Sequence, residues 1–215
     1  MSRRSIGVIA ALALAAIGSN FVFLTKASAP EVRPRFVQQP KTDTDRFINA
    51  ALRQIGVTKT YNPGYVRIPY PNGDVPIGKG VYTDVVIRAL REVGTDLQVS
   101  IHEDAKKFPR RYPRIGSLDS NIDHRRCPNM AAFLEAHAKS LTVELKVPDD
   151  WKAGDIVFWK LSGGKDHVGV LSTKQNSAGF PFVVHNIGAG VSEEDVLGNW
   201  KLVKRFRLPI RGLNE

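Results

Sequence analysis

DIVFWKL at residues 155–161 and HVGVLS at residues 167–172 carry the strongest strand signal in the chain. Both runs are short and rich in β-branched or aromatic residues, and Ser-Gly-Gly at 162–164 marks a turn between them. Two further runs of this kind follow, FVVHNI at 182–187 and KLVKRFRL at 201–208. The last third of the chain is therefore predicted to contain four strands.

Before residue 150 the apolar pattern is helical. Apolar residues at every third or fourth position predict helices from Thr44 to Gly56, over 81–93 and over 129–139. Residues 57–80 and 95–128 are rich in turn residues, prolines and charges, so irregular structure is expected there. Strands that follow helices, instead of alternating with them, indicate an α+β fold. We expect an antiparallel sheet of about four to six strands with the helices packed on one side.

The composition is that of an ordinary globular protein. Of 215 residues, 42% are apolar and 24% charged, which excludes a wholly disordered or collagen-like chain. Cys127 is the single cysteine, so an internal disulfide and a cysteine-rich metal site are excluded as well.

The N-terminus has the pattern of an export signal. Arg3 and Arg4 precede nineteen uncharged residues, 6–24, and a small-residue exit follows. Residues 1–29 are therefore predicted to be a signal peptide or an N-terminal membrane anchor; both alternatives export the remainder to the periplasm or cell envelope, the second one held at the inner membrane. Residues 30–43 hold three prolines and are predicted to be a linker, and 44–215 a single folded domain.

The charge is strongly positive, with 31 Lys and Arg against 21 Asp and Glu, a net +10. In an exported protein nucleic acid is excluded as a partner, and an anionic envelope ligand or a peptide carboxylate is expected. A basic surface that is merely solvated explains the charge equally well.

Two histidines fall on neighbouring predicted strands. Alternation places His167 at the start of one strand and His185 inside the next, close to a helix that begins near Thr83. A helix N-terminus stabilises an anionic nucleophile, a strand histidine takes its proton, and a second polar residue orients the imidazole. A structural, hydrogen-bonded role is the alternative for each histidine.

Seven segments together resemble a known family. They are 65–76 (YVRIPYPNGDVP), 83–89 (TDVVIRA), 121–126 (NIDHRR), 151–157 (WKAGDIV), 166–170 (DHVGV), 185–190 (HNIGAG) and 193–197 (EEDVL). Over roughly residues 44–208 the chain resembles the bacterial family catalogued as domain of unknown function 1287, within the NlpC-like, papain-fold superfamily of cell-wall cysteine peptidases and amidases. The resemblance implies a papain-like fold without a cofactor. It also implies hydrolysis of an amide bond in peptidoglycan, with His167 as general base and His185 or Asn186 orienting it.

The chain departs from that family at the nucleophile, because Tyr82 stands where the family pattern has cysteine. A phenol has a pKa of about 10 against about 8.5 for a thiol, and it attacks amides poorly. Three alternatives follow. The protein is a non-catalytic pseudoenzyme that binds peptidoglycan or a partner through the same groove; Tyr82 or Thr83 is the nucleophile; or Cys127 supplies the thiol, its pKa lowered by the basic residues before it.

The cluster Asp123-His124-Arg125-Arg126 is a candidate substrate contact, together with Thr83 and Asp84 beside position 82. The arginine fork binds carboxylates in pairs of hydrogen bonds, and peptidoglycan stem peptides are rich in carboxylates. An internal salt-bridge cluster is the alternative. His102, Glu103 and Asp104 are metal-ligand types but lack a ligand spacing, so no metal site is predicted and pairing with the lysines and arginines that follow is expected.

Overall fold

The computed structural model describes residues 36–209, so the predicted signal or anchor at 1–29 lies outside the described residues. Within 36–209 the helices are α1 (Asp43–Leu52), α2 (Tyr82–Arg91), α3 (Leu97–Lys107) and α4 (Cys127–His137). The strands there are β1 (Thr60–Tyr61), β2 (Lys79–Gly80), β3 (Lys139–Ser140), β4 (Ile156–Lys160), β5 (Asp166–Gln175), β6 (Pro181–Asn186), β7 (Val191–Glu194) and β8 (Lys201–Arg207). None of these four helices has the length and apolar character needed to cross a membrane.

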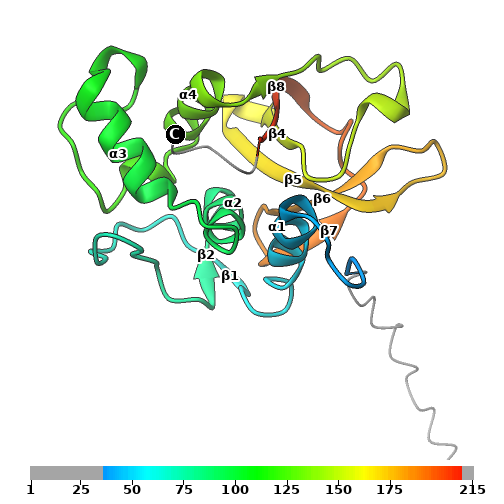
Figure 1. Cartoon of the computed structure of the whole chain (residues 1–215), viewed down its shortest axis with the longest axis horizontal. Coiled ribbons are helices and arrows are strands. Elements are labelled where there is room, and N and C mark those ends of the chain that lie inside the picture. The colour runs from blue at the N-terminus through cyan, green and yellow to red at the C-terminus, as the bar shows by residue number, and fades with distance from the viewer. Residues whose placement is uncertain (1–35, 210–215) are drawn as a thin grey trace, which may run out of the picture. The chain divides into compact units, whose positions relative to one another are not determined.

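Six of the strands form one sheet in the order β3-β8-β4-β5-β6-β7, with every neighbouring pair antiparallel (Figure 1). The α+β class and the antiparallel sheet predicted from the sequence are confirmed. All four predicted strands are present as β4, β5, β6 and β8. The sheet edges β3 and β7 add two short strands, and they were not predicted because Lys-Ser and Val-Ser-Glu-Glu lack an apolar alternation.

The two faces of the sheet bury different apolar clusters. Ile156, Phe158 and Val168 alternate onto the face that packs against the helices. Val157 and Trp159 alternate onto the other face, where they meet Trp151 from the segment before β4 and residues of the loops. The helices thus cover one face only, as expected, and Figure 1 shows α1 and α2 lying together beside β5 and β6.

The three predicted helices are confirmed, but the expectation of irregular structure throughout 95–128 was wrong. Asp96 caps α3 by accepting a hydrogen bond from the Gln98 amide, and Leu97, Ile101 and Ala105 are buried at a spacing of four. This apolar stripe is narrow and the rest of α3 is polar, which hid the helix in the sequence. Helix α3 packs against α4 and the segment 123–125 and lies away from the sheet (Figure 1).

The described end of the predicted linker is attached to α1. Val37 exchanges two backbone hydrogen bonds with the Asn49 side chain, at 2.7 and 3.0 Å. Thr42 and Asp45 then form a reciprocal capping box that begins the helix. The folded part of the described chain therefore extends a few residues ahead of the expected start at residue 44.

Candidate functional site

Tyr82 is the first residue of α2 and lies directly against the strand histidine. Its half-buried ring meets the ring of His167 edge to face, with centroids 4.9 Å apart. Tyr61 is a second aromatic neighbour of Tyr82, with ring centroids 6.3 Å apart. Burial raises the pKa of the Tyr82 hydroxyl well above its ordinary value, and the neighbouring Cys127 and Tyr61 raise it further. The phenol therefore stays protonated at neutral pH.

His167 and His185 form one hydrogen-bonded pair. His167 Nε2 is 2.8 Å from His185 Nδ1, and both side chains are fully buried. In the β5–β6 register Val170 pairs with Val184, so the two histidines are diagonal neighbours on one face. Gly169 lies between them, and a Cβ there would stand 3.2 Å from the His185 Cβ and 2.5 Å from Val183 Cγ1. The absence of a side chain at residue 169 lets the two rings meet.

A carboxylate and two indoles complete the surroundings of the histidines. His185 Nε2 is 2.8 Å from Glu194 Oε2 on β7. Trp159 and Trp200 pack against the ring of His167 at centroid distances of 5.9 and 5.7 Å. Burial, and then the nearby His185, lower the pKa of His167 to about 3. Burial also lowers the pKa of His185, against the opposing effect of Glu194. Both rings are neutral at pH 7.

Of the two residues predicted to orient His167, the structure brings only one to it. His185 contacts His167, whereas Asn186 alternates to the other side of β6 and donates from Nδ2 to the Gly80 carbonyl at 3.2 Å. Asn186 is fully buried, and its bond ties the end of β6 to the segment that leads into α2. Asn186 thus positions the start of α2.

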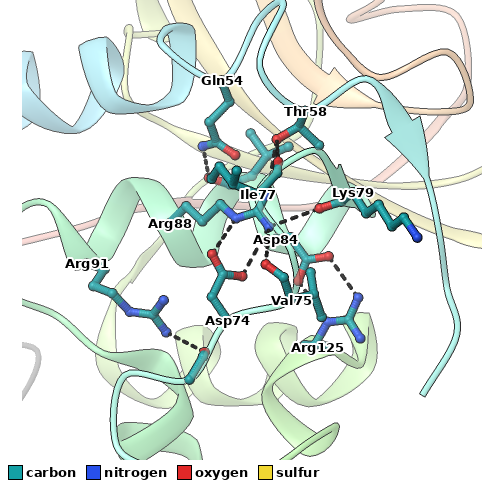
Figure 2. Close-up of polar contacts among 12 residues, drawn as sticks. Gln54, Thr58, Asp74, Val75, Ile77, Lys79, Asp84, Arg88, Arg91 and Arg125 are labelled. Atoms are coloured by element: carbon teal, nitrogen blue, oxygen red, sulfur yellow. Dashed lines mark hydrogen bonds and ion pairs between the residues drawn. The ribbon is translucent and has the colours of Figure 1, made fainter. Parts of the chain in front are cut away.

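The N-terminus of α2 is fixed by a buried ion pair, which Figure 2 shows. Arg125 donates from Nε and Nη2 to the two carboxylate oxygens of Asp84, at 2.8 and 2.9 Å. The same carboxylate accepts the Val81 amide at 2.7 Å, which caps the helix. Thr83 is fully buried and donates to the Arg125 carbonyl at 2.9 Å. Position 82 is therefore held in place by residues on both sides.

Arg88 holds the long segment 57–80 against α2. Its guanidinium forms a two-pronged bond to Asp74 at 2.8 and 3.1 Å (Figure 2). It also donates to the Thr58 hydroxyl and to the Val75 and Lys79 carbonyls. An arginine is suited to this because its five donors are fixed in a plane. This segment, mostly free of regular structure as predicted, carries Tyr61 to the site.

Two adjoining cavities surround Tyr82 and form what we call the groove. One, of about 310 Å³, is lined by Tyr61, Pro63, Val81, Tyr82, Arg114, Ile122, Arg125, Arg126, Cys127, Pro128 and Asp166. The other, of about 380 Å³, is lined by Tyr61, Tyr82, Leu161, Lys165, Asp166, His167 and Ile187. Tyr61, Tyr82 and Asp166 line both cavities. Tyr82 therefore lies where they meet.

Cys127 also reaches the groove, but its environment differs from the expected one. It is the first residue of α4 and is 4% exposed. Burial raises the pKa of the thiol, and Asp166 raises it further. The prediction that the basic residues before Cys127 lower its pKa was wrong: Lys160 lowers the pKa, but burial outweighs that effect. The thiol is protonated at neutral pH.

The predicted substrate cluster divides into internal residues and lining residues. Asp123 and His124 are both 2% exposed; Asp123 accepts the Asp119 amide at 2.7 Å, and burial lowers the pKa of His124 to about 4. Arg125 lines the groove but is paired with Asp84. Arg126 is exposed and lines the groove; it donates to the Arg114 carbonyl, and its Nη1 lies 3.8 Å from Asp123 Oδ1, so the alternative of an internal salt bridge is also present. Substrate contact stays a prediction, and within this cluster it fits Arg126 best.

The acidic segment before the cluster makes internal pairs. Glu103 pairs with Lys106 at 2.7 Å and Asp104 with Arg111 at 2.5 Å, which confirms the expected pairing. Among residues 36–209 no group of three histidine, cysteine or carboxylate side chains is placed to hold a metal ion.

Sequence reasoning missed several residues around the histidines. They are Trp159, Asp166, Gly169, Glu194 and Trp200. A strand prediction over 191–194 would have placed Glu194 opposite β6 and on the side of His185. Trp200 lies in a loop, and no local pattern places it there.

Comparison with known proteins agrees with the segments quoted above. A family model described as "Domain of unknown function (DUF1287)" matches residues 48–208. The uncharacterized protein YijF of Escherichia coli (strain K12) is 45% identical over 201 residues, which cover 92% of this chain and 97% of that protein. The chain belongs to the DUF1287 family.

Proposed function

We propose that the chain is an exported cell-envelope protein that binds peptidoglycan stem peptides in the groove around Tyr82. We further propose that its domain has a papain-like, NlpC-type ancestry in wall amidases and peptidases, with Tyr82 in place of the nucleophilic cysteine. The contact between Tyr82 and His167 carries the proposal. A helix N-terminus facing a histidine whose second nitrogen bonds a further polar side chain is the frame of a cysteine hydrolase.

The chemistry at position 82 favours binding over hydrolysis. A nucleophile must lose its proton to attack an amide, and burial raises the pKa of the Tyr82 hydroxyl. The bulky ring also occupies the junction of the two cavities. A ligand therefore lies over Tyr82 and is not attacked by it.

The lining of the groove suits a peptide with carboxylates. Arg126 is exposed at its wall, and Arg114 and Lys165 line the same two cavities. Tyr61 and Tyr82 line both cavities and offer apolar ring surface there. Export of the chain, predicted from residues 1–29, would bring this groove to the peptidoglycan in the periplasm.

Hydrolysis is the second candidate, and one observation favours it. The Nδ1 atom of His167 is buried without a hydrogen-bond partner among the described residues, as a base awaiting a proton would be. Cys127 lines the same groove, although burial keeps its thiol protonated. Release of wall fragments that Cys127→Ser abolishes would establish this activity.

The test is co-sedimentation of the 215-residue chain with purified sacculi, followed by mass spectrometry of the supernatant. We expect saturable binding, competition by soluble stem peptides, and no released fragments. Absence of binding over the accessible concentration range would overturn the proposal, and release of fragments would replace it with hydrolysis.

A further inference from the structure

The bond between His167 and His185 joins two nitrogens, so a single proton lies between them in the neutral pair. His167 Nε2 and His185 Nδ1 are 2.8 Å apart. A neutral imidazole has one N–H donor and one acceptor nitrogen. If His167 donates this bond, its other ring nitrogen is a bare acceptor. If His185 donates it, the other nitrogen of His167 carries a proton.

Glu194 decides the direction. Its side chain is 46% exposed, and a carboxylate only accepts hydrogen bonds. His185 Nε2, 2.8 Å from Glu194 Oε2, must therefore carry the proton of its ring. His185 Nδ1 is then the acceptor, and His167 Nε2–H is the donor. The second carboxylate of the strand does not compete, because Glu193 accepts from the Ser172 hydroxyl at 2.5 Å.

The tautomer of His167 leaves one of its ring nitrogens free to accept a hydrogen bond. With its proton on Nε2, His167 has a bare, accepting Nδ1, and this is the last polar atom of the side chain. That atom is buried and has no partner among residues 36–209. Its ring packs against Trp159 and Trp200, and the Trp159 indole N–H is already donated to the Leu197 carbonyl at 3.0 Å. His167 itself lines the groove beside Tyr82.

We propose that Glu194 is a positioning residue which, through His185, holds His167 in the Nε2–H tautomer, so that Nδ1 accepts a proton or hydrogen bond from an N–H, O–H or S–H group in the groove. Among residues 36–209, Glu194 does not line the groove and makes no hydrogen bond to Tyr82; it acts across two rings. The tautomer assignment holds whatever the ligand is, and only the identity of that ligand as a wall peptide rests on the proposed function.

The direct test is long-range ¹H–¹⁵N NMR of the histidines in the native 215-residue chain at pH 7, without ligand. We expect Nε2 to be protonated in both His167 and His185. Free neutral imidazole also favours one tautomer, so two variants isolate the effect of Glu194. Glu194→Leu should populate the second tautomer in both rings, whereas Glu193→Leu on the same strand should leave them unchanged. A protonated His167 Nδ1 in the native chain, or identical tautomers in Glu194→Leu, would overturn the proposal.

A second experiment measures how well His167 acts as a base. A thiol introduced by Tyr82→Cys should be alkylated by iodoacetamide below pH 7, with a pH profile shifted below that of a free thiol. Adding Glu194→Leu should slow alkylation at pH 6 by about tenfold or more, a loss of the size seen when the outer hydrogen-bond partner of a metal-ligating histidine is removed. Adding Glu193→Leu to Tyr82→Cys should leave the alkylation rate unchanged. Equal rates in the two double variants would contradict the inference, while failure of sacculus binding would contradict the proposed function alone.

Discussion

His167 Nε2 lies 2.8 Å from His185 Nδ1, and this diagonal pair on β5 and β6 is the centre of the candidate site. The pair is fully buried, faces the first residue of α2, and is bonded at its far end by Glu194. It combines the features of a catalytic base with a neighbour, Tyr82, that does not suit nucleophilic attack.

The His167–His185 pair requires β5 and β6 to lie close together at Gly169. We expect Gly169→Ala to lower the free energy of unfolding by about 1–3 kcal/mol, because the new Cβ would stand 2.5 Å from Val183 Cγ1. Gly188→Ala is the matched control, since nothing lies within 4 Å of a Cβ there. Urea denaturation measures both, and equal stabilities would contradict the packing described here.

The Asp84–Arg125 pair is predicted to be essential for the fold around α2. Both side chains are 3% exposed, so Asp84→Asn leaves a buried arginine charge without its partner. We expect a loss of about 3–5 kcal/mol in urea denaturation, and partial recovery in Asp84→Asn/Arg125→Met. Glu92→Gln, which breaks the exposed Arg53–Glu92 pair, should change stability by less than about 1 kcal/mol. A loss of stability below about 1 kcal/mol in Asp84→Asn would contradict this prediction.

Stability should fall on mild acidification because of the buried histidines. The pKa of His124 is lowered from 6.5 to about 4 in the folded state, so between these values the unfolded chain binds more protons. Stability therefore rises with pH across this window and is lost as pH falls through it. His124 alone contributes a loss of about 2 kcal/mol from pH 7 to pH 5. His167 and His185, whose pKa values are also lowered, act in the same direction.

The measurement is the free energy of unfolding of the native chain and of His124→Leu at pH 7 and pH 5. The difference between the two pH values should be smaller in the variant by about 2 kcal/mol. If the change in the free energy of unfolding between pH 7 and pH 5 is the same in both proteins, His124 is protonated in the folded state as readily as in the unfolded state, and the prediction fails.

Arg126 is predicted to bind wall carboxylates. A charge-assisted hydrogen bond contributes about 1.5–3 kcal/mol, so Arg126→Ala should weaken binding to sacculi by about tenfold or more. Arg126→Lys should recover part of the affinity, because it keeps the charge and loses the fork. The control is Arg53→Ala, another exposed arginine, which does not line the groove. Equal affinities of Arg126→Ala and Arg53→Ala in co-sedimentation would remove Arg126 from the binding surface.

Much of the fold could be predicted from local pattern. The alternation in β4 and β5 and the apolar stripe of α2 come from burial on one face, which leaves a period in the sequence. Helix α3 was missed because it packs against α4 and buries only a narrow stripe. β7 was missed because Val191 is the only apolar residue in it.

The candidate site was predictable in its types of residue and less so in its pairings. The strand alternation placed His167 and His185 on adjacent strands, and position 82 followed from the resemblance to the family. The choice of His185 over Asn186 depends on which side of β6 faces His167, and the neutral state of Cys127 depends on burial. Such tertiary properties have no local signal.

The central claim is that the groove is a hydrolase frame with tyrosine at the position of the nucleophile, and gain of activity tests it most directly. Sacculi are incubated with the native chain, with Tyr82→Cys and with Tyr82→Ala, which opens the groove without supplying a thiol, and released fragments are identified by mass spectrometry. The account predicts peptide fragments from Tyr82→Cys alone. Fragments from the native chain or from Tyr82→Ala, or none from Tyr82→Cys when it is folded and binds sacculi, would contradict it.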